Sequence, residues 1–126
     1  MNEDRRLWVR LAALSGLVSV AAGAFAAHGV TDPAAKDLLR TGAQYQAVHA
    51  LAILVWAALF PAVGRRAALS PAFFLAGSIL FSGSLYAMAL GAPHWLGAVT
   101  PIGGVLFLVG WGVLAWAATQ AAPAAD

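Results

Sequence analysis

The sequence contains no cysteine among its 126 residues. Disulfide bonds, thiolate nucleophiles and thiolate metal ligands are therefore excluded. Charge is also scarce, because only 10% of the residues are Asp, Glu, Lys or Arg, whereas 62% are hydrophobic. A soluble domain of this size would need far more polar surface to stay dispersed in water. The composition therefore indicates a membrane protein, and the length leaves room for one domain.

Charged residues are nearly absent from four long stretches, residues 7–27, 42–60, 71–90 and 101–119, in which Arg10 is the single exception. A helix needs about 20 mostly apolar residues to cross the hydrocarbon core of a bilayer. We therefore predict an all-α integral membrane four-helix bundle that forms a single domain over residues 1–126. Residues 32–40 mix apolar and charged positions, which predicts a short interfacial helix between the first and second spans.

The basic residues are distributed unevenly between the two ends of the predicted bundle. Arg5, Arg6, Arg10, Arg65 and Arg66 lie at one end, and only Lys36 and Arg40 lie at the other. The positive-inside rule then predicts an inner membrane protein with both termini in the cytoplasm. The basic residues form no continuous stripe, so we expect no nucleic acid as a partner. Membrane lipids are the expected partners of the apolar spans. A homo-oligomer or another membrane protein is an open alternative.

Proline and glycine mark the expected ends of the helices. Three pairs of a capping residue and a proline predict helix starts: Asp32-Pro33, Ser70-Pro71 and Thr100-Pro101. The side chain before each proline can accept a hydrogen bond from the N–H groups of the first helical turn. Gly29, Pro61 and Gly91 are predicted to end the preceding helices.

Small residues recur along one face of several predicted spans. They are Ser15, Ser19 and Gly23 in the first span, Gly77 and Gly83 in the third, and Gly103 and Gly110 in the fourth. Small side chains let helix backbones approach closely in lipid, so these positions predict helix packing inside the bundle. Self-association through one of these faces is the alternative.

Uncharged polar residues gather in the half of the spans that faces away from the termini. They are His28, Tyr45, Gln46, His49, Ser82, Ser84, Tyr86 and Thr100. Polar side chains are costly at this depth unless they are paired. We predict a hydrogen-bonded cluster in which His28, Gln46 and His49 contact the third span through Ser82 or Tyr86. The cluster either fixes the packing of the helices or lines a pocket for a lipid or small ligand.

Metal, haem and hydrolase sites find less support in the sequence. Imidazole suits zinc, copper or nickel, but no carboxylate or thiolate joins the histidines within the spans. Bis-histidine haem needs two ligands at matching depth, whereas His49 lies inside its predicted span and His28 lies at the edge of another. A hydrolase built on Ser82 or Ser84 with His49 would lack an acidic residue to orient the imidazole. We therefore assign no catalytic or metal-ligating residue and expect no cofactor. A non-enzymatic binding protein is the first hypothesis, and an oligomeric channel or transporter subunit or a histidine-based metal or haem protein are the alternatives.

Several ordered motifs resemble one known family over nearly the whole chain. They read AAGAFAAHG at 21–29, YQAVHALA at 45–52, FSGSLY at 81–86, TPIGG at 100–104 and GW at 110–111. This series is similar to that of the domain of unknown function 423 family. The resemblance implies four membrane spans and no assigned activity. It also marks the same polar positions that membrane depth singles out.

Overall fold

A computed structural model describes residues 1–120 as four long helices with two short 3₁₀ turns. The order is α1 (Glu3–His28), α2 (Pro33–Val63), η1 (Gly64–Ala67), α3 (Ser70–Ala89), η2 (His94–Ala98) and α4 (Thr100–Thr119). Each long helix is apolar and long enough to cross a membrane. The predicted all-α four-helix membrane bundle is therefore confirmed.

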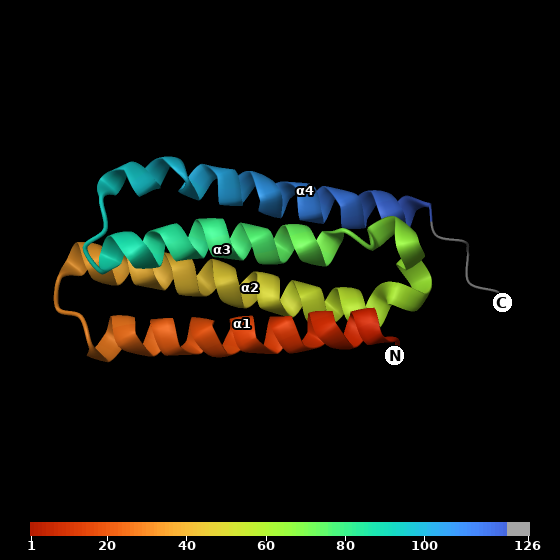
Figure 1. The fold of residues 1–126 in the computed structure, drawn as a ribbon, viewed down its shortest axis with the longest axis horizontal. Helices are drawn as coiled ribbons and strands as arrows, with labels where there is room; N and C mark the ends of the chain where they lie inside the picture. The colour runs from red at the N-terminus through yellow and green to blue at the C-terminus, as the bar shows by residue number, and fades with distance from the viewer. Residues whose placement is uncertain (121–126) are drawn as a thin grey trace.

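The helices run up and down in chain order, and each packs chiefly against its neighbours in the sequence. Figure 1 shows α2 and α3 in the middle with α1 and α4 on the two outer sides. The start of α1 and the last turn of α4 lie at the same end of the bundle (Figure 1). This arrangement leaves a gap between α1 and α3, which contact each other far less than each contacts α2.

The predicted interfacial helix is not a separate element. Residues 32–40 form the first turns of α2, which runs without a break from Pro33 to Val63. The start was predicted correctly, because Asp32 accepts a hydrogen bond from the Ala35 N–H at 3.1 Å. Ala35 and Leu39 are buried against the bundle, and Lys36 Nζ donates to the Ala26 carbonyl at 2.9 Å. These contacts hold the first turns of α2 in line with the rest of the helix.

The predicted end of α2 at Pro61 is wrong by two residues, since the helix continues to Val63 and is closed at Gly64. Proline has no N–H, so the carbonyl four residues earlier, that of Ala57, loses its helical partner. Arg5 replaces this donor, because its Nη1 lies 3.3 Å from the Ala57 oxygen. The arginine thereby connects the start of α1 to the last turns of α2.

Ser70 and Thr100 begin α3 and α4, but neither side chain caps its helix. An N-cap residue needs extended backbone angles. Leu69 and Val99, which occupy that place, have helical angles of φ −87° and −78°. The chain enters both helices from the preceding 3₁₀ turns η1 and η2, so the first turns need no side-chain cap.

The small residues of α3 and α4 pack these two helices closely together. A Cβ added to Gly103 would lie 2.4 Å from the Phe81 backbone nitrogen. Side chains at Gly77 and Gly110 would meet the rings of Phe107 and Phe74 at 2.5 and 2.7 Å. In α1, Ser15 and Ser19 are buried, and Gly23 is in ordinary contact with Ala43 in α2. Gly83 differs, because a Cβ there would have no neighbour within 4 Å in the described part of the chain.

Candidate functional site

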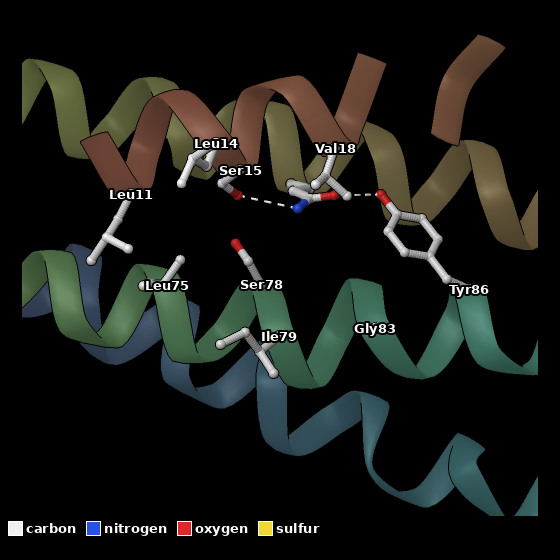
Figure 2. A pocket seen from close by; sticks show the side chains of 10 residues that line it. Leu11, Leu14, Ser15, Val18, Leu75, Ser78, Ile79, Gly83 and Tyr86 are labelled. Carbon is white, nitrogen blue, oxygen red and sulfur yellow. Dashed lines mark hydrogen bonds between the residues drawn. The ribbon is translucent and has the colours of Figure 1, made fainter. Parts of the chain in front are cut away.

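A row of polar side chains connects α1, α2 and α3 near the middle of the bundle. Gln46 Nε2 donates to Ser15 Oγ at 3.2 Å, and the Tyr86 hydroxyl donates to Gln46 Oε1 at 2.7 Å. Figure 2 shows this row running between the helices. We call Ser15, Gln46 and Tyr86 the polar row. The predicted link from Gln46 to the third span therefore exists, and it uses Tyr86.

Gly42 and Ser82 hold Tyr86 in place at the end of the polar row. The Tyr86 ring lies against Gly42, where an added Cβ would sit 2.5 Å from a ring carbon. Ser82 Oγ donates to the Gly42 carbonyl at 2.7 Å, and both residues are buried. Any side chain at position 42 would displace the ring, so the glycine is what allows α3 to bring Tyr86 to Gln46.

The polar row lies at the base of a groove of about 430 Å³ between α1 and α3. The groove is lined by Leu11, Leu14, Ser15, Val18, Gln46, Leu75, Ser78, Ile79, Gly83 and Tyr86. We call it the α1–α3 groove. Leu14, Val18 and Ile79 are 60%, 45% and 64% exposed, so its apolar walls continue into the surface that would face lipid. Figure 2 shows Ser15 and Ser78 on opposite sides of the groove.

The groove retains hydrogen-bonding capacity that the described part of the chain does not use. The Gln46 amide has two N–H donors, and one of them is engaged with Ser15. Since Ser15 Oγ accepts in that bond, its own O–H is free to donate. Ser78 Oγ donates to the Phe74 carbonyl at 2.9 Å and keeps its lone pairs. The groove therefore offers donors and an acceptor to an uncharged polar group held between apolar walls.

His49 does not join the polar row but lies on the other side of α2, against α4. Its Nε2 lies 3.0 Å from Trp111 Nε1, and its Nδ1 lies 2.7 Å from the Tyr45 carbonyl. The indole N–H can only donate, so Nε2 accepts and Nδ1 carries the proton. The imidazole is neutral in this arrangement, and both of its nitrogens are engaged.

Aromatic rings surround His49 and fill the space between α2, α3 and α4. The imidazole stacks on Phe107 with ring centroids 3.6 Å apart and an interplanar angle of 8°. Tyr45 packs on Phe81 at 4.6 Å between ring centroids. We call His49, Tyr45, Phe81, Phe107 and Trp111 the aromatic layer. His49 and Phe107 are buried in this layer, whereas Tyr45 and Trp111 lie at its exposed edges.

The remaining predicted residues lie apart from both groups. Ser84 Oγ and Thr100 Oγ1 are 2.6 Å apart and join α3 to the start of α4. His28 is exposed at the end of α1, so the structure does not bring it to Gln46 or His49. Among residues 1–120, no three His, Cys, Asp or Glu side chains come together as metal ligands would.

Sequence reasoning missed three residues that matter at these sites. Ser15 was assigned to packing alone, although it also hydrogen-bonds Gln46. Ser78 lines the groove, and Trp111 is the partner of His49. The periodicity of each helix placed these residues on a face, but not opposite a particular neighbour. The GW motif at 110–111 was the one available signal for Trp111.

Comparison with known proteins agrees with the membrane fold. A family model described as protein of unknown function (DUF423) matches residues 22–104. A UPF0382 membrane protein of Haemophilus influenzae is 45% identical over 112 residues, which cover 86% of this chain and 90% of the relative. The inner membrane protein YgdD of Escherichia coli is 42% identical over 116 residues, covering 86% of each chain.

A more distant relative covers still more of both chains. The membrane protein YwdK of Bacillus subtilis is 37% identical over 120 residues, which cover 91% of this chain and 98% of the relative. No solved structure matches the chain significantly. Since the family model and these relatives span most of the sequence, the chain belongs to the DUF423 family of small membrane proteins, for which no enzymatic activity is indicated.

Proposed function

We propose that this protein binds an uncharged lipid in the α1–α3 groove, with a hydroxyl or carbonyl group of the lipid at the polar row. The observation that carries the proposal is the pairing of apolar walls with a polar base, on the side of the bundle where α1 and α3 are apart. The volume of about 430 Å³ falls within the range of about 300–1,000 Å³ typical of ligand pockets.

The depth and chemistry of the groove favour this class of ligand. Ser15 and Gln46 lie near the middle of α1 and α2, far from the interface where charged headgroups sit. No charged side chain of residues 1–120 lines the groove, and a charge buried at this depth would be costly. An uncharged lipid avoids this cost and uses the free donors of Ser15 and Gln46. An acyl chain alone, with no polar group in the groove, would leave these donors unused.

Filling the groove should abolish binding. Gly83 lines the groove and has open space where a side chain would begin, so Gly83→Leu should block it without disturbing the fold. In detergent, 1-hexadecanol at about ten times its Kd should raise the Tm of the natural protein by roughly 5 °C. Circular dichroism should show no such rise for Gly83→Leu.

Gly112→Leu is the matched control for this test. Gly112 is exposed on α4 and also has no neighbour within 4 Å of an added Cβ. Both substitutions therefore make the same change in helix propensity. Hexadecane, which lacks the hydroxyl, should stabilise all three proteins equally and weakly. Equal stabilisation of Gly83→Leu and Gly112→Leu by the alcohol would contradict the proposal.

We also propose that the protein lies in the inner membrane with both termini in the cytoplasm. Arg5, Arg6, Arg65 and Arg66 lie at the end of the bundle where α1 starts and α4 ends, and such short basic segments favour the cytoplasmic side. Fused to the C-terminus and expressed in Escherichia coli, green fluorescent protein should fluoresce and alkaline phosphatase should be inactive. The reverse pattern would overturn this orientation.

A further inference from the structure

A second cavity, of about 440 Å³, lies at the end of the bundle where α1 begins and α2 ends. Its polar lining comes from Asn2, Asp4, Arg5 and Arg65, and its aromatic lining comes from Trp56 and Phe60. We call it the arginine pocket. It is separate from the α1–α3 groove, since the two share no lining residue. Its place at the end of the spans corresponds to the membrane interface.

The aromatic wall of the arginine pocket is fixed by packing. Trp56 is 2% exposed, and its Nε1 donates to the Ala67 carbonyl at 2.7 Å. This bond ties the η1 turn, and with it Arg65, to α2. Phe60 meets the Trp56 ring edge-on with centroids 5.4 Å apart. This wall of the pocket is therefore fixed by contacts within the fold.

Arg5 is held in this pocket but is not fully engaged. Its guanidinium carbon lies 5.2 Å from the centre of the Phe60 ring, which favours the cation electrostatically. Nη1 donates to the Ala57 carbonyl. The Nε atom is buried and has no hydrogen-bond partner among residues 1–120. A buried donor without a partner is costly, so an acceptor supplied from outside would stabilise this arrangement.

The charge balance of the pocket favours an anion. Within residues 1–120 a single ion pair forms, between Arg6 and Glu3 at 3.5 Å, and both side chains are exposed. Among residues 1–120, Asp4 is the one carboxylate that lines the pocket. It forms no ion pair with Arg5 or Arg65. The two guanidinium groups of the pocket therefore lack a carboxylate partner in the described part of the chain.

We propose that the arginine pocket binds the phosphate group of an anionic phospholipid headgroup. A guanidinium presents paired N–H donors that match two phosphate oxygens. Basic pockets at the ends of membrane helices are suited to anionic headgroups. Trp56 and Phe60 provide an apolar wall for the glycerol and the first part of the acyl chains, as aromatic side chains do at membrane interfaces. This site is independent of the α1–α3 groove.

Arg65→Gln is the sharpest test of this site, because the Arg65 side chain lines the pocket and makes no hydrogen bond with the rest of residues 1–120 that the fold would lose. Native mass spectrometry of the full chain in detergent would compare dioleoyl phosphatidylglycerol with dioleoylglycerol, which lacks the phosphate. Arg65→Gln should lose about tenfold in affinity for the phospholipid relative to the natural protein. Its affinity for dioleoylglycerol should not change.

Arg66→Gln is the matched control. It removes the same charge from the same turn, but Arg66 lies outside the pocket and donates to the Gln120 carbonyl. Its loss of phospholipid affinity should be at most about twofold. Equal losses of phospholipid affinity for both variants would overturn the proposal.

Inorganic phosphate at about 20 mM distinguishes the two sources of a phosphate group. If it displaces the phospholipid from the natural protein and not from Arg65→Gln, the pocket recognises the phosphate group by itself. If it does not compete while the difference between Arg65→Gln and Arg66→Gln remains, the ligand is the intact lipid. Failure of the Gly83→Leu experiment would leave this proposal intact, since that residue lines only the groove.

Discussion

Gly103→Val should be among the most destabilising single changes in this protein, lowering the free energy of unfolding by about 3 kcal/mol. The first carbon of the new side chain would lie 2.4 Å from the Phe81 nitrogen and 2.8 Å from the Phe81 Cα. These are backbone atoms, so the clash cannot be relieved by rotating a side chain. The two helices must move apart, and Gly77 and Gly110 would lose their contacts along the same interface.

Gly104→Val provides the control at the next position. An added Cβ there would meet only the Phe81 ring, at 3.9 Å, which is ordinary contact. Both variants exchange glycine for valine within the same helix, so the change in helix propensity cancels. Thermal unfolding followed by circular dichroism should show a much lower Tm for Gly103→Val alone. Similar values for the two variants would mean that α3 and α4 are not this close.

Trp56→Ala is expected to lower the free energy of unfolding by about 3–5 kcal/mol. The indole is 2% exposed and forms the centre of a cluster with Ala57, Val63, Ala67 and Ala117. Its removal leaves a void and also takes away the N–H that satisfies the Ala67 carbonyl. Because this cluster joins α2, η1 and α4, the end of the bundle that holds the arginine pocket should loosen first.

Two further variants separate the contributions to this effect. Trp56→Phe keeps most of the apolar volume and loses the hydrogen bond, which should cost about 1 kcal/mol. Trp116→Ala removes an indole of the same size that is 54% exposed on α4, where lipid or detergent can replace it. Unfolding in denaturing detergent, monitored by circular dichroism, measures the stability of all three tryptophan variants. A Trp56→Ala protein as stable as Trp116→Ala would contradict this account of the core.

The helix ends show where local rules hold and where they stop. Asp32 caps α2 as the sequence predicts, because an extended residue precedes the helix. Ser70 and Thr100 do not cap, because the 3₁₀ turns before them already have helical angles. Pro61 does not end α2, because Arg5 from a distant part of the chain supplies a donor to the freed carbonyl. A signal read from neighbouring residues fails when a distant residue provides the missing hydrogen bond.

The candidate site shows the same division. Membrane depth and the family motifs singled out Gln46 and Tyr86, and the structure pairs these two side chains across the bundle. The predicted partnership of His28 with Gln46 and His49 is wrong in geometry, because His28 is exposed at the end of α1. His49 faces Trp111, which no depth argument could indicate. Neighbouring positions such as Tyr45 and Gln46 point to different sides of α2, so one apparent cluster became two separate networks.

The sequence by itself determined the number of long apolar helices and the need of the deep polar residues for partners. Both follow from local properties, since a bilayer of fixed thickness selects about 20 apolar residues and penalises unpaired polar groups wherever they occur. Only the tertiary structure decided which helices are neighbours and how each is rotated about its axis. Those choices depend on contacts between residues distant in the chain, such as Gly103 against Phe81. The same contacts leave the groove between α1 and α3 open.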